Sequence, residues 1–383
     1  MKILQVIPVF YPALTFGGPV RVVCSTSKEL AKRGHEVIVY TTNALDQKRN
    51  FKIRCRERVL NGFKVRYFEN VFRFDGVYVS PSMVSALRKD MEDFDVVHLT
   101  SWRQLQDIFL HIFAKKNNVP YILQAHGSLP RIMAKQRLKL IYDAFYGYRL
   151  LRDASKVIAL SHTEAKQYMD MGVPEKKIEI IPNGIDLSEY GDLPPKGSFK
   201  KKFSIDDDEK IVLYLGRIHE SKGLNLLANA FAVVSSNLSS IRLVVVGPDD
   251  GYAATFSRLI SDLGIQEKVL LTGFVQKRSK LAALVDSDVF VTPRFYGFPV
   301  TFLEACSAEC PIVTASNELD WIHDNVGYVV ENSPIVLAKA ISKVLRHEAT
   351  SERFRNNCKS AIKNFDISTV VSQLEDTYKS VVN

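Results

Sequence analysis

This sequence of 383 residues lacks the features that define membrane-spanning and secreted proteins. No stretch approaches the ~18 uninterrupted apolar residues that a bilayer-spanning helix needs. Residues 3–8 are apolar except for Gln5, and this run is too short and too interrupted for a signal peptide and is typical of a buried strand. We therefore expect a cytoplasmic protein.

The cysteines form neither a disulfide pattern nor a metal-binding pattern. There are five, an odd number, and no two of them form a CxxC pair. Cys306 and Cys310 lie four positions apart on an expected helix, a spacing that would bring two ligands to one face. No histidine or further cysteine nearby completes a site, so we interpret both as buried free thiols and expect no metal site.

A negative net charge is also absent, and the positive surplus is uneven. The formal net charge is +9. Residues 1–190 hold 29 Lys and Arg against 19 Asp and Glu, whereas the remainder holds 22 against 23. The surplus lies in the first half, which indicates an anionic partner there, such as phospholipid head groups, a diphosphate-linked acceptor or nucleic acid.

Short β-rich runs alternate with helical patterns, which predicts an α/β protein with mostly parallel sheets covered by helices. We expect strands at residues 2–7, 36–41, 65–68, 96–99, 121–124, 156–160, 211–216, 242–247, 269–272, 289–292 and 312–315. Helices fit between them, for example at residues 21–33, 224–235, 252–263 and 277–285.

The length favours two domains rather than one. Pro and Gly cluster at residues 181–198, where the hydrophobic periodicity lapses. We predict one domain at residues 1–190 and another at 191–367, with a ligand cleft between the carboxyl ends of their strands. A last helix, at residues 368–383, lies beyond the final strand, and a return to the first domain is one arrangement open to it.

A cationic turn follows the expected strand at residues 211–216. It reads Gly-Arg-Ile-His-Glu-Ser-Lys-Gly and places Arg217 five positions before Lys222, ahead of an amphipathic helix. Such a pair can converge on one anion, and the helix N-terminus adds unpaired amides. A diphosphate fits this pattern, and two solvated loop cations are the alternative.

A second pattern follows the strand at residues 289–292. It includes Tyr296, Gly297, Phe298, Pro299 and Glu304. A helix is expected to begin near Pro299, a favourable first-turn residue. Glu304 lies in an apolar run of that helix, where a carboxylate is unfavourable unless it meets hydrogen-bond donors. Ribose hydroxyls are suitable donors, and a salt bridge to an arginine is the structural alternative.

Two weaker patterns occur in the first half. His126 follows an expected strand within Gln-Ala-His-Gly-Ser, although a lone histidine is more often a local hydrogen-bonding group, as we also interpret His98. Gly17 and Gly18 follow Phe16 ahead of the first helix. Paired glycines there allow a ligand to approach the helix N-terminus closely, or simply form a tight turn.

In their order and spacing, these patterns resemble the retaining glycosyltransferases of family four, which have the GT-B fold. The resemblance covers nearly the whole chain. It also includes residues 157–161, 182–186, 246–248 and 273–275. It implies two Rossmann-like doubly wound domains facing each other across a cleft, the first for the acceptor and the second for the nucleotide sugar.

The resemblance also implies roles for single residues. Arg217 and Lys222 would hold the diphosphate of a UDP-, GDP- or ADP-sugar, Glu304 the ribose hydroxyls, and the backbone at Val275 the base. His126 would lie beside the transferred sugar. The reaction would proceed with retention at the anomeric carbon and without a cofactor, in the synthesis of cell-surface polysaccharide or glycolipid.

One position departs from the family pattern. Members usually carry two glutamates eight positions apart, and Tyr296 replaces the first, which contacts the donor sugar. Tyrosine forms hydrogen bonds but carries no charge near neutral pH. Gly297, Phe298 and Pro299 would complete the donor site around it, and Gly18 would lie near the phosphate and the acceptor.

The proposed chemistry needs no metal ion, because Arg217, Lys222 and helix-terminal amides would stabilise the leaving diphosphate. Asp286 and Asp288 match a metal-binding Asp-x-Asp pattern, but they lie between an apolar helix and a strand. We therefore interpret them as capping and turn residues. No residue is an obvious enzymic nucleophile, which favours same-face attack over double displacement.

The segment from Arg131 to Arg152 carries six Lys and Arg with one acid, Asp143, among apolar and aromatic residues. This mixture is typical of a helix on an anionic membrane surface. A helix packed on the sheet with a solvated basic face explains it equally well. The first interpretation predicts a peripheral enzyme at the inner face of the membrane, acting on a glycan or lipid-linked acceptor.

Other functions share parts of this pattern. A dinucleotide-dependent oxidoreductase should show G-x-G-x-x-G after a strand, which the glycine-rich turns here do not match. A catalytically silent nucleotide-sugar-binding partner or a GT-B sugar-nucleotide epimerase would keep the donor contacts. Nucleic-acid binding is not expected, because no recognition motif accompanies the positive charge.

Overall fold

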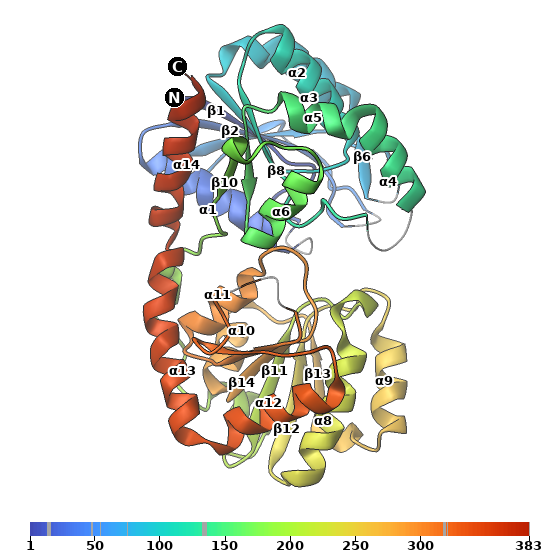
Figure 1. The fold of residues 1–383 in the computed structure, drawn as a ribbon, viewed down its shortest axis with the longest axis vertical. Helices are drawn as coiled ribbons and strands as arrows, with labels where there is room; N and C mark the ends of the chain where they lie inside the picture. The colour runs from blue at the N-terminus through green and yellow to red at the C-terminus, as the bar shows by residue number, and fades with distance from the viewer. Residues whose placement is uncertain are drawn as a thin grey trace. The chain divides into compact units, whose positions relative to one another are not determined.

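The computed structural model describes every residue except 14–16, 47–48, 54, 75, 132–135, 317–318, 320 and 383. The chain forms two compact units (Figure 1). Unit 1 comprises Met1–Gly184 and Ile367–Asn383, and unit 2 comprises Ile185–Asp366. No helix in the described parts of the chain combines the length and the apolar content that crossing a membrane requires.

The change from unit 1 to unit 2 falls after residue 184, earlier than the predicted boundary at 190. Ile185 donates its backbone N–H to the carbonyl of Phe365 at 2.9 Å. The Tyr190 hydroxyl donates to Glu304 at 3.1 Å. These bonds hold residues 185–190 on unit 2. The Pro and Gly cluster marks a turn, but it does not reveal which core the following residues join.

Unit 1 is built on an eight-stranded sheet with the order β10-β9-β8-β7-β1-β2-β4-β3. All neighbouring strands are parallel except β3 and β4. The strands are β1 (Lys2–Val6), β2 (Glu36–Thr42), β3 (Glu57–Leu60), β4 (Phe63–Phe68), β7 (Val96–Leu99), β8 (Tyr121–Gln124), β9 (Lys156–Ala159) and β10 (Ile178–Ile180). A separate antiparallel hairpin joins β5 (Phe72–Phe74) to β6 (Val77–Val79).

Helices cover both faces of this sheet, which explains why its strands are apolar runs rather than alternating ones. One core lies under α1 (Gly18–Lys32) and α14 (Ile367–Val382). The core on the other face lies under α2 (Pro81–Asp90), α3 (Leu105–Lys116), α5 (Tyr148–Asp153) and α6 (His162–Asp170). Helix α4 (Gln136–Tyr142) buries none of its side chains.

The C-terminal helix α14 packs beside α1 in unit 1 (Figure 1). Arg33 donates to one carboxylate oxygen of Glu375 at 2.6 Å, and His35 Nε2 lies 2.6 Å from the other. Farther along the helix, the buried Tyr378 places its hydroxyl 2.7 Å from His98 Nδ1. Polar contacts and a continuous apolar stripe thus join the last residues of the chain to the first sheet.

Unit 2 is built on a six-stranded, fully parallel sheet with the order β13-β12-β11-β14-β15-β16. The strands are β11 (Lys210–Leu215), β12 (Ile241–Val246), β13 (Val269–Gly273), β14 (Val289–Thr292), β15 (Ile312–Thr314) and β16 (Gly327–Val329). The helices are α7 (Ser198–Phe203), α8 (Leu224–Asn237), α9 (Ala253–Asp262), α10 (Lys277–Asp286), α11 (Val300–Ser307), α12 (Pro334–Arg346) and α13 (Glu348–Ala361).

Candidate functional site

The carboxyl edge of the unit 2 sheet brings the expected donor motifs together. Strand β11 lies between β12 and β14, so the strand order reverses there, which is where open α/β sheets bind ligands. The turn after β11 pairs with the loop after β12, because Ile218 N–H donates to Pro248 O at 2.9 Å and Asp250 N–H donates to Ile218 O at 3.0 Å. Helix α11, with Glu304, follows β14 at the same edge.

Arg217 is partly exposed and already paired with an acid. Its Nη1 donates to Asp250 Oδ2 at 2.5 Å, and 44% of its side-chain surface is exposed. The preceding acid, Asp249, instead accepts backbone N–H groups at the start of α9, and that of Ala253 contributes most to the lowering of the Asp249 pKa. A diphosphate at Arg217 would therefore compete with one specific carboxylate.

Lys222 ends a short 3-10 turn directly before α8. Gly223 joins the two with a φ of +73°, and a Cβ there would lie 3.1 Å from side-chain atoms of both Pro293 and Arg294. Glycine satisfies both the backbone and the space. Helix α8 has no acid in its first turn and no side-chain cap at Gly223, so its first amides lie next to Lys222. The same contact brings the exposed Arg294, which sequence reasoning did not select, to this turn.

Glu304 is buried and makes two strong contacts through one oxygen. Its Oε1 accepts from Lys280 Nζ at 2.5 Å and from the Tyr190 hydroxyl at 3.1 Å. The residue is only 2% exposed. The structural alternative considered from sequence was a salt bridge to an arginine, and a lysine from α10 takes that place. The contact with Lys280 gives this buried carboxyl group an ion-pair partner beside the proposed nucleotide site.

The residues before α11 divide between surface and core. Tyr296 keeps 39% of its surface exposed. Phe298 is buried, and its ring lies against Trp321 and Phe365 at centroid distances of 6.1 and 5.5 Å. The Phe298 ring is therefore part of the core, which leaves only the backbone of this residue for contact with a ligand. Pro299 is the N-cap rather than a first-turn residue as predicted, because its ψ of 120° is extended.

Two further positions that the sequence predicts at the donor site, Gly297 and Val275, would contribute their backbone. Gly297 has a φ of +70° in the loop before α11. Val275 follows β13, whose last residue, Gly273, has a φ of +66°. Phe274, which lies between Gly273 and Val275 in the sequence, keeps 68% of its surface exposed. An exposed ring beside a strand end is suited to contact a planar base.

His126 lies directly after β8 in a strained backbone conformation. Its φ is +50°, which few residues other than glycine adopt. The residue keeps some exposed surface, but its Nε2 is buried and meets no hydrogen-bond partner within the described structure. Burial of the ring, with a smaller effect of His98, lowers the pKa of His126 to about 3. The imidazole is therefore neutral near pH 7.

Helix α6 fixes the conformation of this histidine loop. Glu164 Oε1 accepts the Gly127 N–H at 2.6 Å, and its Oε2 accepts the Leu160 N–H at 2.7 Å. The Tyr168 hydroxyl accepts the Ala125 N–H at 3.0 Å. Sequence reasoning missed Glu164, although the spacing Ser161-x-x-Glu164 after a strand is a helix-start signal that would have found it.

Gly17 and Gly18 begin helix α1, and Phe16 lies outside the described residues. Gly17 has a φ of +82°, and a Cβ there would meet nothing within 4 Å. Among the described residues, the backbone conformation rather than crowding therefore requires the glycine. The first turn of α1 contains no acid and no side-chain cap at Gly17, which leaves its amides available to a ligand.

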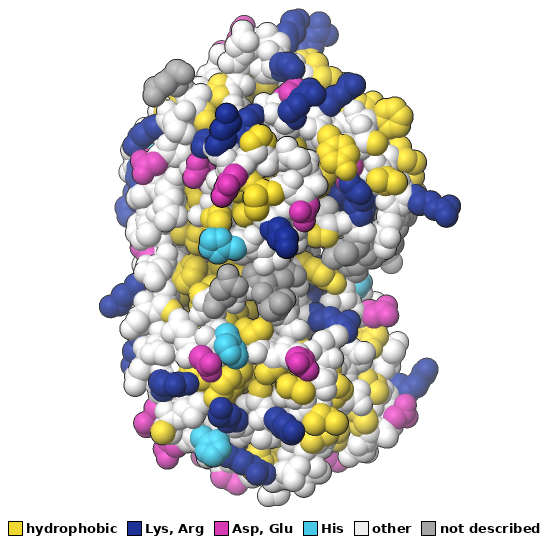
Figure 2. Space-filling view, in the orientation of Figure 1, with side chains coloured by type: hydrophobic (Ala, Val, Ile, Leu, Met, Phe, Trp, Pro, Cys, Tyr) yellow, Lys and Arg dark blue, Asp and Glu magenta, His cyan; other side chains and the backbone are white. Residues whose placement is uncertain are grey.

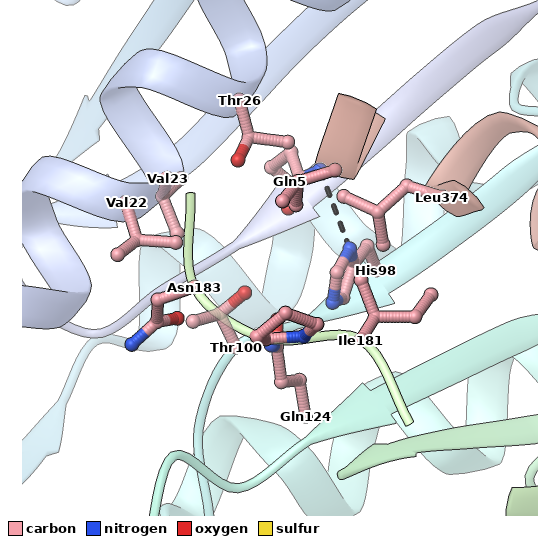
Figure 3. Close-up of a pocket in the computed structure, with 12 residues that line it drawn as sticks. Gln5, Val22, Val23, Thr26, His98, Thr100, Gln124, Ile181, Asn183 and Leu374 are labelled. Carbon is pink, nitrogen blue, oxygen red and sulfur yellow. Dashed lines mark hydrogen bonds between the residues drawn. The ribbon is translucent and has the colours of Figure 1, made fainter. Parts of the chain in front are cut away.

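A small pocket with a mixed polar and apolar lining lies between the unit 1 sheet, α1 and α14 (Figure 3). Gln5, His98 and Gln124 line it from the neighbouring strands β1, β7 and β8. His98 Nδ1 lies 2.7 Å from the Tyr378 hydroxyl and 3.5 Å from Gln5 Nε2. Burial lowers the pKa of His98 to about 4. His98 is therefore a neutral hydrogen-bonding group under the C-terminal helix, as interpreted from sequence.

Two other interpretations are confirmed. Asp286 accepts the N–H groups of Gly197, Phe199 and Lys200 at the start of α7, at 2.5 to 3.0 Å. Asp288 accepts the N–H of Ile211 at 2.8 Å, so both acids serve capping and turn roles. The thiols of Cys306 and Cys310 are buried and unbonded to each other.

The basic segment in unit 1 forms α4, one π-helical turn and α5, while Ile132, Met133 and Lys135 lie outside the described residues. Its acid, Asp143, is fully buried and paired with Arg103 and Arg131, each at 2.8 Å. Exposed apolar side chains remain at Leu138, Leu140, Ile141, Phe145, Tyr146 and Tyr148. The packed-helix alternative fits α5, which buries two leucines, but does not fit α4.

Two doubly wound α/β sheets, with phosphate-type motifs at the carboxyl edge of the second, define a glycosyltransferase with the GT-B fold. The Glycosyltransferase Family 4 model matches residues 16–189, and the Glycosyl transferases group 1 model matches residues 195–361. The chain therefore belongs to the family 4, group 1 glycosyltransferases. The resemblance and the α/β fold expected from sequence are confirmed.

Relatives with related names align over most of the chain. An uncharacterized glycosyltransferase of Methanocaldococcus jannaschii is 24% identical over 96% of both chains. The UDP-Gal:alpha-D-GlcNAc-diphosphoundecaprenol alpha-1,3-galactosyltransferase of Escherichia coli is 26% identical over 79% of both. The alpha-monoglucosyldiacylglycerol synthase of Streptococcus pneumoniae is 26% identical over 76% of this chain and 66% of its own.

Solved structures share the fold. HepE of Anabaena, determined with UDP and glucose, superposes with a TM-score of 0.79 at 18% identity, covering 99% of this chain and 100% of its own. The lipopolysaccharide glycosyltransferase WaaG superposes with a TM-score of 0.70 at 17% identity, covering 98% and 99%. At these identities the likeness concerns the fold.

Proposed function

We propose that this protein transfers a sugar from a UDP-, GDP- or ADP-sugar to a glycan or lipid-linked acceptor, with retention and without a metal ion. One observation carries the proposal. The cationic turn with Arg217 and Lys222, the start of α8 and the buried Glu304 lie at one edge of the unit 2 sheet, at its switch point. Names of relatives that use UDP-Gal or bind UDP support a nucleotide-sugar donor.

The cations act where charge develops. As the bond between the anomeric carbon and the phosphate oxygen breaks, negative charge grows on the leaving diphosphate. Arg217 would exchange Asp250 for this diphosphate, while Lys222 and the α8 amides bind its oxygens. Glu304, which is hydrogen-bonded to Lys280, would accept hydrogen bonds from the ribose hydroxyls.

Retention follows from same-face attack. The acceptor hydroxyl forms the new bond to the anomeric carbon on the side that the diphosphate leaves, and its proton passes to a phosphate oxygen. His126 is neutral near pH 7, so it would form a hydrogen bond to the transferred sugar rather than supply a charge. Its loop, fixed by Glu164, would hold that contact in place.

Tyr296 favours one second candidate, a catalytically silent donor-binding partner. It stands where family members carry a glutamate, and it is partly exposed beside the donor site. An enzyme consumes donor in the presence of acceptor, whereas a silent partner binds donor without consuming it. The Tyr296→Glu variant restores the family residue. Turnover by this variant, with none by the wild type, would favour the catalytically silent partner.

The acceptor side is proposed to meet an anionic membrane through the basic segment. This segment exposes several apolar side chains. It carries six Lys and Arg but only one acid, Asp143, which is buried. Relatives named for diphosphoundecaprenol and diacylglycerol substrates support a lipid-linked acceptor and a peripheral location at the inner face of the membrane. Wild-type protein should sediment with anionic vesicles and dissociate as salt rises.

Donor consumption tests the reaction itself. Each sugar nucleotide is incubated with protein, with and without candidate lipid-diphosphate and glycolipid acceptors, with EDTA present in a parallel set. We expect acceptor-dependent release of nucleoside diphosphate, unchanged by EDTA, and a product with the donor's anomeric configuration. Epimerised donor without acceptor, inversion, or loss of activity in EDTA would each contradict the proposal.

A further inference from the structure

The β5–β6 hairpin of unit 1 exposes apolar side chains that the transfer reaction does not use. Phe72 and Phe74 keep 60% and 57% of their surface exposed, and Val71 just before them keeps 61%. Contiguous exposed apolar residues on a soluble domain usually mark an interaction site. The sequence analysis did not select this segment.

The two faces of the hairpin differ in character. The register puts four apolar side chains on one face, those of Phe72, Phe74, Val77 and Val79. Arg73 pairs with Tyr78 on the other face, where Tyr78 is buried in a small core and Arg73 stacks over its ring at 5.9 Å. The buried face anchors the hairpin, and on the opposite face Phe72 and Phe74 keep more than half of their surface exposed.

Gln104 holds the hairpin beside the basic segment. Its Nε2 donates to Gly76 O at 2.9 Å, and its Oε1 accepts the Tyr78 N–H at 3.1 Å. Its own carbonyl accepts the Tyr142 hydroxyl, from the end of α4, at 3.2 Å. Figure 2 shows hydrophobic side chains next to Lys and Arg in the region where Figure 1 places α4 and β6.

We propose that Phe72 and Phe74 insert into the interface of an anionic membrane, as a second contact beside α4. This inference rests on the proposed recruitment of the protein to a membrane. A soluble acidic partner would match the cations of the basic segment but would leave the outward aromatic rings in water. An anionic lipid surface accommodates both, because head groups meet the cations and the interface takes up aromatic rings.

The charges around the hairpin set the depth. Neither strand carries an acid, and β5 carries one cation, Arg73. A charged side chain is unfavourable in hydrocarbon but tolerated among head groups, so insertion reaches the interfacial level and not the bilayer centre. The basic segment supplies a contact that salt weakens, and the hairpin supplies a contact that salt does not weaken.

A double substitution separates these two contacts. F72S/F74S and the control I335S, which alters an equally exposed (60%) residue of unit 2, are compared by co-sedimentation with phosphatidylglycerol and phosphatidylcholine vesicles at low and high salt. We expect F72S/F74S to lose about tenfold in partition to anionic vesicles and nearly all binding that survives high salt. Nucleotide binding by all three proteins, followed by thermal shift, verifies that they are folded.

Outcomes for the hairpin and for membrane recruitment are distinguishable. If wild-type protein binds no anionic vesicles, recruitment fails and the hairpin proposal with it. If wild-type and F72S/F74S bind equally, recruitment stands and the hairpin proposal is overturned. It is also overturned if sedimentation shows that the wild type self-associates and F72S/F74S does not, because the aromatic face would then serve a second copy of the chain.

Direct contact with lipid is measured by quenching. Phe72→Trp should shift its emission to the blue on anionic vesicles and be quenched by lipids brominated near the head group, more than by lipids brominated near the chain end. Ile335→Trp should respond to neither. An unquenched Trp at position 72, in a variant that still sediments with vesicles, would contradict insertion.

Discussion

The two units of this glycosyltransferase carry their functional chemistry in different ways. In unit 2 the candidate residues follow strand ends in sequence, so a short motif names them and the parallel sheet brings them to one edge. In unit 1 the important features come from tertiary contacts, such as Glu164 reaching back to Gly127 and Gln104 holding the hairpin. A sequence motif therefore identifies a site when its residues lie at the strand ends that the sheet aligns. It does not identify a site that depends on tertiary contacts between distant segments.

The strongest test of this contrast removes the cation of unit 2. Arg217→Ala should lower kcat/KM by about 10²- to 10³-fold, because a preorganised charge on the leaving diphosphate is lost. Vesicle binding through unit 1 should not change. Arg258→Ala, an exposed arginine on α9, is the matched control. Activity within threefold of wild type in the Arg217 variant would break the contrast.

A buried carboxylate gives the largest expected effect in unit 1. Glu164→Gln replaces an acceptor of two backbone N–H groups with an amide that faces one of them with its own donor, so unit 1 should lose about 2 kcal/mol of unfolding free energy. Urea denaturation, with amide exchange read separately for each unit, measures the loss. Glu175→Gln, at an exposed site, should leave both units unchanged.

The histidines of unit 1 predict a dependence on pH. Burial holds the folded-state pKa of His98 near 4 and of His126 near 3, below the unfolded value of about 6.5. As pH falls below about 6.5 the unfolded state binds protons at these histidines first, so each lowers the unfolding free energy of unit 1 by at most about 1.4 kcal/mol per pH unit. Asp107, whose pKa burial raises to about 7, acts in the opposite direction and offsets part of this decrease.

The unfolding free energy of unit 1, measured by amide hydrogen exchange between pH 7 and 4, reports the histidine contribution. The His98→Gln substitution should make its decline with falling pH shallower. An equal decline in the His98→Gln variant would show that other groups dominate.

The smallest effect sharpens the description of unit 2. Asp250→Asn removes the carboxylate that pairs with Arg217 and would repel an incoming diphosphate, so the Kd for a nucleoside diphosphate should fall about threefold. Calorimetry at low and moderate salt measures this change. Weaker binding in the variant would mean that Asp250 orients Arg217 for its ligand instead of competing for it.

Regular elements of the fold were predictable from sequence, and short or irregular ones were not. The strands at 96–99, 121–124 and 289–292 were expected with the bounds that the structure has, because apolar runs between turn residues fix them. The antiparallel β3 and the strands β5, β6 and β16 were not expected, because β3 is exposed and has no apolar run, and the other three span only three residues each.

The candidate site was predictable to the same degree. Lys222 and Glu304 lie at the strand edge that their positions predicted, whereas the partners Asp250, Lys280 and Tyr190 come from other elements and have no local signal. Phe298 shows a different limit: its place in a family motif predicts a ligand contact, but the motif does not reveal that packing places its ring in the core.

Calorimetric titration of UDP, GDP and ADP against the wild type and the R217A/K222A variant tests the central claim most directly. The account predicts that at least one nucleoside diphosphate binds the wild type, that its nucleoside without phosphates binds far more weakly, and that the double variant loses about 100-fold in affinity while unit 2 remains folded. Equal affinity in the two proteins would contradict a diphosphate site at this turn.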